Sequence, residues 1–211
     1  MSMRARIHTR KTVYNADYLR VDRMDITATD SVSEKSSAVH TRECLIMHDS
    51  VAILLYDPKP DSIVLIEQIR PGALVRRDDD DACDGIALEV VAGTVETGED
   101  KRMAAEREVR EEAAVDVLAI EEIGNYLLCP GYSSEKMTLF CACVDSDVTS
   151  STQHELTGLA DEHEYIHPKL FPADAVQNIL MHPQLTMPAV ALLHWFLHHH
   201  DRIRAQWRNV R

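Results

Sequence analysis

Residues 93–115 read GTVETGEDKRMAAEREVREEAAV, and the run from Glu106 to Val115 places four glutamates within a few residues of one another. Residues 99–114 have a helix-forming composition with few helix breakers, which predicts one helix. At about 100° per residue, Glu108, Glu111 and Glu112 of this helix fall within one arc of roughly 100°. Beside the arc lies an apolar stripe, which we expect to face a sheet, formed by Ala105, Val109 and Ala113.

The crowding of these carboxylates costs helix stability, since like charges four residues apart destabilise a helix by roughly 0.2–0.5 kcal/mol per pair. A shared divalent cation could offset the repulsion, because hard cations such as Mg²⁺ take carboxylate oxygens as ligands together with substrate phosphates. A solvated acidic helix face would explain Glu106, which points away from the apolar stripe. It explains Glu108 and Glu112 poorly, because both flank that stripe.

A short strand-to-helix loop with two glycines precedes the helix. Gly93 ends a predicted buried strand, IALEVVAG (86–93), and Glu99 follows directly after Gly98. Read from Gly93, the stretch resembles the Nudix box: Gly, five residues, Glu, seven residues, Arg-Glu, an apolar residue, any residue, Glu-Glu, any residue, Gly and an apolar residue. The matching positions are Gly93, Glu99, Arg107, Glu108, Val109, Glu111, Glu112 and Val115.

One position departs from this pattern, because Ala114 stands where the box has a glycine. A left-handed conformation there costs alanine about 1–2 kcal/mol. Alternatively, the helix continues slightly beyond this residue. The departure concerns the end of the helix and not the chemistry, because no ligand atom comes from this side chain.

The resemblance implies an α/β protein with the Nudix-type α/β/α sandwich, in which the box helix lies over a mixed sheet. It also implies hydrolysis of a nucleoside diphosphate linked to another moiety, with Mg²⁺ as the cofactor or Mn²⁺ in its place. Arg107 would orient the glutamates by charge-assisted bonds, Glu99 would brace the loop, and Gly93 would be structural. The implied metal ligands are Glu108 and Glu112 as principal ligands, Glu111 as a secondary one, and the carbonyl oxygen of Ala92.

A loop of some twenty residues, DSDVTSSTQHELTGLADEHE (145–164), separates two predicted strands. Loops of this length in compact domains are usually functional or disordered. An acidic mobile surface loop is the simpler interpretation. However, its GLADEHE end resembles the loop that follows the box in the ADP-ribose pyrophosphatase branch of the Nudix family. That resemblance implies Glu162 as the general base and Glu164 as a further metal ligand.

Other stretches match the same branch. Pro130 lies fifteen residues after Val115, an offset that marks ADP-sugar hydrolases of the family. The resemblance implies substrate contacts from Tyr18, Arg42, Arg70 and Glu135, the last across a dimer interface. Tyr18 could stack on adenine, since aromatic stacking contributes about 1–3 kcal/mol per base. A structural arginine at a sheet edge, or a tyrosine packed in its own domain, are the alternatives.

Residues 1–47 are polar, with short alternating stretches and too few apolar residues for a core of their own. We expect a strand-rich N-terminal arm here and the Nudix domain in residues 48–211. In the resembling branch the N-terminal strands swap across a homodimer. Apolar runs further along predict strands at 50–57, 62–70, 125–129, 136–144 and 165–171, and helices from Pro172 and from Pro188 to Trp207.

The last helix carries the tract His198-His199-His200. Three consecutive helical residues point in different directions and cannot converge on one metal ion. We therefore expect a solvated helix face here.

Composition narrows the class of partner. The formal net charge of −13 disfavours binding to nucleic acid or anionic membranes by bulk attraction. No apolar run reaches membrane-spanning length, and five cysteines without zinc-like spacing suggest reduced thiols. We expect a cytoplasmic protein that acts on a small molecule.

The predicted function is Mg²⁺-dependent hydrolysis of ADP-ribose, or a related ADP-sugar, to AMP and ribose 5-phosphate. Hydrolysis of another nucleoside diphosphate sugar, such as GDP-mannose, is the alternative. A nucleotide-sugar sensor without turnover is a different class of protein. The complete set of glutamates speaks against it, because a sensor need not keep a general base and all the metal ligands. An RNA 5′-end hydrolase would require a basic surface, which the composition does not favour.

Overall fold

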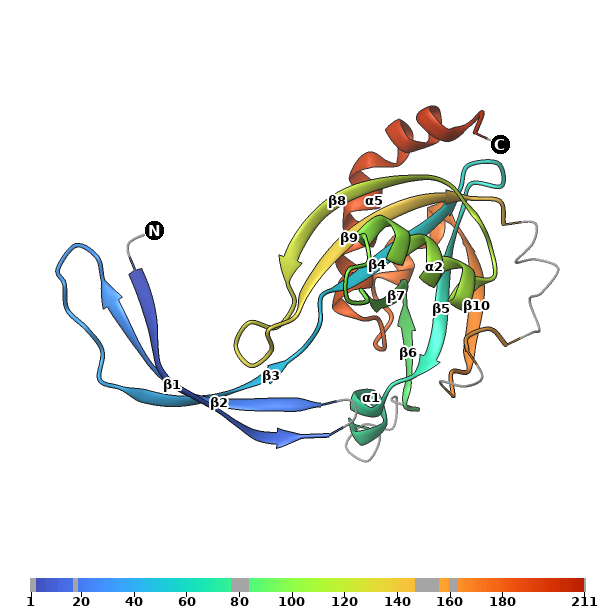
Figure 1. Cartoon of the computed structure of the whole chain (residues 1–211). Helices are drawn as coiled ribbons and strands as arrows, with labels where there is room; N and C mark the ends of the chain where they lie inside the picture. Colours follow the sequence, from blue (N-terminus) through green and yellow to red (C-terminus); the bar gives the residue numbers. More distant parts are fainter. Residues whose placement is uncertain (1–2, 17–18, 77–83, 147–155, 160–162, 211) are drawn as a thin grey trace. The chain divides into compact units, whose positions relative to one another are not determined.

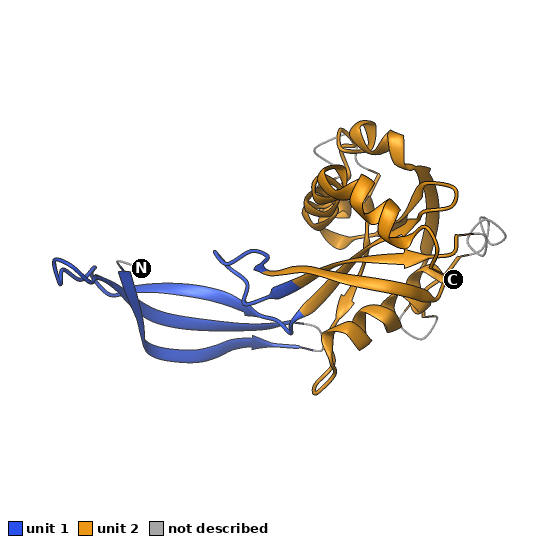
Figure 2. Ribbon diagram, turned by 90° about the horizontal axis from the view of Figure 1, so that it is seen from above, with its two compact units in different colours: residues 1–49, 126–137 blue, residues 50–125, 138–211 orange. Residues whose placement is uncertain are grey.

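The computed structural model describes residues 3–16, 19–76, 84–146, 156–159 and 163–210. They form two compact units, one from Met1–Asp49 with Tyr126–Met137, the other from Ser50–Asn125 with Thr138–Arg211 (Figure 2). The predicted boundary between the arm and the domain, at residues 47 and 48, lies close to the change from the first unit to the second at Asp49 and Ser50. The segment 126–137, which the sequence places with the Nudix domain, groups with the N-terminal residues instead.

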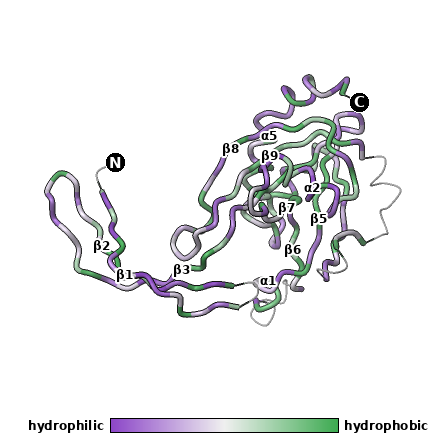
Figure 3. Tube along the Cα trace, in the orientation of Figure 1, coloured by the Kyte–Doolittle hydropathy of each residue, from purple (hydrophilic) through white to green (hydrophobic). Residues whose placement is uncertain are grey.

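The first unit is built on an antiparallel sheet in the order β1-β2-β3. The strands are β1 (Met3–Asn15), β2 (Arg20–Asp30) and β3 (His40–Ile46). β1 is exposed along its whole length, and hydrophilic and hydrophobic residues are mixed along β1 and β2 (Figure 3). Buried Asp22 accepts hydrogen bonds from Arg10, Thr12 and Arg20, and those from Arg20 do most to hold its carboxyl pKa below the usual range. Polar contacts thus support a sheet that lacks an apolar core.

The second sheet follows the order β10-β5-β4-β9-β8, with β6 beside β5 and β7 beside β4. β4 and β5 are antiparallel, whereas the arrows of β4 and β9 point the same way, so the sheet is mixed (Figure 1). Its strands are β4 (Ser50–Asp57), β5 (Ser62–Ile69), β6 (Ile86–Glu89), β7 (Val91–Thr94), β8 (Val117–Leu127), β9 (Lys136–Val144) and β10 (Ile166–Pro172). The helical elements are α1 (Pro71–Arg76), α2 (Lys101–Ala113), η2 (Ala173–Ala175), α4 (Val176–Ile179) and α5 (Met187–Trp207).

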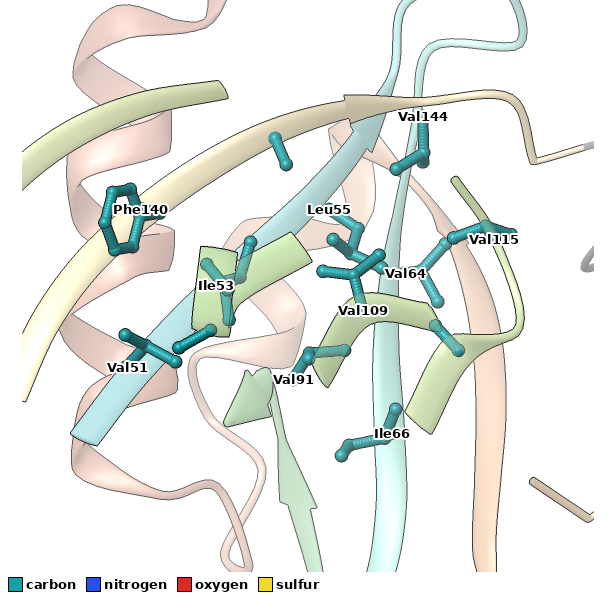
Figure 4. Close-up of a cluster of buried hydrophobic side chains, with 14 of the residues drawn as sticks. Val51, Ile53, Leu55, Val64, Ile66, Val91, Val109, Val115, Phe140 and Val144 are labelled. Atoms are coloured by element: carbon teal, nitrogen blue, oxygen red, sulfur yellow. The ribbon is translucent and has the colours of Figure 1, made fainter. Parts of the chain in front are cut away.

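Helices cover both faces of this sheet, because alternate side chains of its central strands point to opposite sides. On one side, Val109 of α2 packs among Leu55, Val64 and other apolar side chains (Figure 4). On the other side, the ring of Tyr56 lies 5.1 Å from that of Phe196 in α5, edge to face. The predicted α/β/α sandwich is therefore confirmed. The predicted apolar face of the last helix is also buried: Ala189, Leu192, Leu193, Phe196, Ile203 and Trp207.

Some local predictions were wrong. The single strand predicted at 86–93 is two strands, because β6 pairs with β5 whereas β7 pairs with β4. Pro172 does not begin a helix but ends β10, and a 3₁₀ turn follows it. The strand predicted at 125–129 begins earlier, at Val117. Each error concerns pairing or a boundary that depends on residues distant in sequence.

The histidine tract is not simply solvated. His200 Nε2 lies 2.7 Å from Asp61 Oδ1 and 3.3 Å from the hydroxyl of buried Tyr56. The ring of His199 stacks on Trp195, with centroids 4.6 Å apart. His198 Nδ1 lies 2.7 Å from the carbonyl oxygen of His194, so all three histidines have contacts, each with a different residue.

Candidate active site

The box helix has a defined start and end. Asp100 caps its N-terminus by accepting hydrogen bonds from the backbone N–H groups of Arg102 (2.9 Å) and Met103 (3.3 Å). Ala114 ends it with a left-handed backbone at φ 54°. The first of the two interpretations of Ala114 is therefore correct, and alanine adopts a left-handed conformation where the box pattern has a glycine.

The carboxylates of the arc lie where the helix meets the sheet. Glu108 is 8% exposed and Glu112 is 2% exposed, as expected for residues beside the stripe of Ala105, Val109 and Ala113. Glu112 accepts a hydrogen bond from the backbone N–H of Ala92 (2.9 Å), which links the helix to β7. Glu111 is half-buried.

Gly93 makes room for one of these carboxylates. A Cβ atom at this position would lie only 1.9 Å from Glu108 Cδ and 2.0 Å from its Oε1. No side chain fits there while Glu108 keeps its place. The glycine of the box is therefore required by close approach, and not by the turn that follows it.

Arg107 joins the acidic residues of the box. Its guanidinium donates to Glu99 at 3.0 Å, to Glu108 at 2.8 Å and to Glu111 at 2.9 Å, and also to the carbonyl of Thr94. Hydrogen bonds from Arg107 lower the pKa of Glu99. The arginine thus orients two carboxylates of the arc and ties the preceding loop to the helix.

Burial changes the protonation of the two innermost glutamates. Loss of solvation raises the pKa of Glu108 to about 7, although Arg107 opposes the shift. Loss of solvation also raises the pKa of Glu112 well above its usual range, with further contributions from the charges of Glu108 and Glu164. Without a cation these carboxylates are therefore costly to ionise together.

The donor set fits a hard divalent cation, since it consists of oxygens from buried, mutually repelling carboxylates. Within the described ranges, no three acidic, His or Cys side chains converge closely enough to hold an ion. Arg107 and the N–H of Ala92 engage the oxygens of Glu108, Glu111 and Glu112. A cation would have to compete with these contacts.

Two further predicted residues lie at the same place. Glu164 accepts a hydrogen bond from the backbone N–H of Leu159 (3.2 Å), and its charge acts on both Glu108 and Glu112. Arg70 forms an ion pair with Glu89 at 2.7 Å, and its charge opposes the rise in the pKa of Glu112. The structure therefore brings Arg70 and Glu164 to the box carboxylates. Glu89 was not singled out from the sequence, because its role depends on the pairing of β5 with β6.

The other predicted substrate residues fall into two groups. Arg42 and Glu135 belong to the first unit and not to the unit that carries the box. There, Arg42 Nη1 donates to the carbonyl of Thr41 (2.9 Å), and the N–H of Glu135 donates to Ser133 Oγ (3.1 Å). Tyr18, like the predicted base Glu162, lies outside the described residues. The roles assigned to these four residues stay predictions.

Comparison with known proteins identifies the family. A family model for the NUDIX domain matches residues 47–196. The chain belongs to the Nudix family. An ADP-ribose pyrophosphatase from Haemophilus influenzae is 31% identical over 173 residues, which cover 82% of this chain and 77% of that protein. A GDP-mannose pyrophosphatase from Cronobacter sakazakii is 31% identical over 123 residues, or 58% of this chain and 60% of that protein.

A solved structure of an "ADP compounds hydrolase" has the same fold, with a TM-score of 0.69 over 95% of this chain and 96% of that chain. Its sequence identity of 18% makes this a likeness of fold alone. The family match and the curated relatives make this chain a Nudix pyrophosphohydrolase, as predicted, in a family that uses divalent metal ions. Among the described residues, no helix is long and apolar enough to cross a membrane.

Proposed function

We propose that this Nudix domain uses Mg²⁺ to hydrolyse the pyrophosphate bond of ADP-ribose to AMP and ribose 5-phosphate, or that of a related ADP-sugar to AMP and the sugar phosphate. The observation that carries the proposal is the cluster of Glu108, Glu111 and Glu112. Arg107 donates to the first two, and Glu164 lies beside the cluster. The ADP-ribose pyrophosphatase from Haemophilus influenzae, which this chain matches over 77% of that protein's length, supports the choice of substrate. The acidic net charge disfavours nucleic acid as a substrate, and we expect the activity in the cytoplasm.

Each residue has one task in this proposal. Glu108 and Glu112 would hold Mg²⁺, or Mn²⁺ in its place, with Glu111, Glu164 and the carbonyl of Ala92 as further oxygens. The bound cations would neutralise the pyrophosphate and lower the pKa of a bound water.

Other residues orient the ligands, bind the substrate or accept a proton. Arg107 fixes the orientation of Glu108 and Glu111 by the hydrogen bonds described above. Arg70, which is partly exposed and close to Glu112, would donate to the pyrophosphate or to the terminal phosphate-ribose. Glu162 would take the proton of the attacking water as general base. Tyr18, Arg42 and Glu135 would bind the nucleotide.

A substrate panel tests the activity. The full chain with Mg²⁺ is given ADP-ribose, ADP-glucose, GDP-mannose and NADH, and the products are separated by chromatography. We expect the highest kcat/KM with ADP-ribose, and products formed in oxygen-18 water identify the phosphorus that is attacked. A higher kcat/KM with GDP-mannose would favour the activity of the Cronobacter sakazakii relative. No hydrolysis of any compound would favour a sensor.

The proposal includes a homodimer in which strands of the first unit pair across the two copies. Its support is the exposure of β1, whose side chains are exposed throughout although they include Met3, Ile7, Val13 and Tyr14. We expect the full chain to sediment as a dimer at micromolar concentration, and a chain that begins at residue 48 to lose turnover. An active monomer in active-enzyme sedimentation would contradict this part of the proposal.

A further inference from the structure

The C-terminal end of α2 needs partners from elsewhere in the chain. The last four carbonyl groups of a helix have no N–H partner within it. Here the helix ends at Ala113, and left-handed Ala114 turns the chain away. The carbonyls of Glu111 and Glu112 are among those left without a helical partner, and both residues also belong to the box.

Residues distant in sequence supply two of the missing donors. The hydroxyl of Thr157 donates to the carbonyl of Glu112, and the backbone N–H of Gly158 donates to the carbonyl of Glu111 at 3.0 Å. Thr157 is itself fixed to the first residue of β10, because its N–H and C=O form both hydrogen bonds of a bridge with Ile166 (2.8 and 3.1 Å). This segment therefore joins the box helix to the edge of the sheet.

The same segment holds Glu164. The backbone N–H of Glu164 donates to the carbonyl of Leu159, and its carboxylate accepts from the N–H of Leu159, both at 3.2 Å. Gly158 has a left-handed backbone at φ 94°, and a Cβ there would lie 2.7 Å from the Cβ of Glu164. Glu164 thus packs directly against the residue that caps Glu111.

We propose that Thr157 and Gly158 are positioning residues, which cap the last turn of α2 and thereby hold the carboxylate of Glu164 in register with the box glutamates. The chain of contacts is short: Glu112 to Thr157, Thr157 to Gly158, and Gly158 to Glu164. Residues whose side chains would bind the cations are thus linked through their own backbone carbonyls to the segment that supplies the next carboxylate. The inference rests on the proposed function only in treating these carboxylates as ligands of a divalent cation.

A double-mutant cycle tests the link without turnover. Mn²⁺ is titrated into the full chain, and free Mn²⁺ is measured by electron paramagnetic resonance for wild type, T157V, E164Q and T157V/E164Q. Valine keeps the shape of threonine and removes the hydroxyl. We expect T157V to weaken Mn²⁺ binding about 10-fold, as for other residues that orient metal ligands. In the E164Q background, T157V should weaken Mn²⁺ binding no further. The single variant T157S keeps the hydroxyl and should bind Mn²⁺ within about 2-fold of wild type.

The opposite results are equally clear. If the losses of Mn²⁺ affinity in T157V and E164Q add in the double variant, Thr157 acts on the fold alone and the proposal is wrong. Unchanged Mn²⁺ binding in T157V or in E164Q would also overturn it. If T157V does not fold, as judged by thermal unfolding, G158A replaces it. This variant leaves the Thr157 hydroxyl in place and displaces Glu164, so its loss should also vanish in the E164Q background. Because no substrate is used, failure of the substrate panel would refute the proposed activity and leave this cycle interpretable.

Discussion

Replacing Glu112 by glutamine (E112Q) is expected to lower kcat with ADP-ribose by at least about 1,000-fold, or roughly 4 kcal/mol of transition-state stabilisation. Glutamine keeps the shape of the side chain, and its amide oxygen can still accept the hydrogen bond from Ala92. The variant therefore removes the charge and leaves the contact between β7 and α2. Steady-state kinetics with varied Mg²⁺ measures the loss, and excess metal should not recover it.

The same variant should unfold at a higher temperature than wild type in metal-free buffer at pH 8. Glu112 is almost fully buried, and its pKa lies well above the ordinary value of 4.5. The folded chain thus holds this proton at pH values where the unfolded chain has lost it, so stability falls as pH rises above about 4.5. A neutral amide escapes this loss. Activity and stability should change in opposite directions.

Melting temperatures in chelator between pH 5 and pH 8 measure this second effect. Wild type should lose stability across the range, whereas E112Q should lose less, and Mg²⁺ at pH 8 should stabilise wild type more than E112Q. The matched control is E106Q, earlier on the same helix, where Glu106 pairs with Arg102 away from the arc. E106Q should keep wild-type kcat. If E112Q retains a tenth of the activity, Glu112 does not hold an essential cation.

Replacing Gly93 by Ala is expected to cost about 100-fold or more in kcat/KM. The new methyl group would occupy the position of the Glu108 carboxylate, at 1.9–2.3 Å from its atoms. Glu108 must then leave its place and its hydrogen bond with Arg107. Gly72 offers a matched control, because a Cβ there would meet nothing within 4 Å. G72A should therefore behave as wild type in kcat/KM and in thermal unfolding.

A second substitution shows that the clash, and not a turn, is the cause. Shortening Glu108 to Ala removes the atoms that the methyl group would meet. G93A should therefore lower the melting temperature of wild type but hardly change that of E108A. Equal destabilisation in both backgrounds would show that Gly93 is needed for its backbone, and would refute the packing argument.

Local pattern was sufficient for much of the site. The positions of Glu108, Glu111 and Glu112 on one edge of a helix follow from helical periodicity, and so does the buried stripe beside them. Arg107 lies within about one turn of both Glu108 and Glu111, so its bonding role could also be anticipated. The family match confirms the enzyme class that the box indicated.

Other features could not be anticipated because they depend on pairing between distant segments. The pairing of β5 with β6 places Arg70 beside Glu89, nineteen residues later. The segment Tyr126–Met137 groups with the N-terminal strands, although the sequence placed it with the second domain. His200 meets Asp61 across 139 residues of sequence. Apolar periodicity carries no information on such contacts.

By itself, then, the sequence determined the box helix, its acidic arc, the α/β class and the family, because these follow from the order and spacing of nearby residues. Only the tertiary structure decided why Gly93 must be glycine, how deeply Glu112 is buried, and that Thr157 and Gly158 cap the helix that carries the box. The physical reason is that burial, close approach and the capping of helix ends are set by whichever distant segment packs alongside.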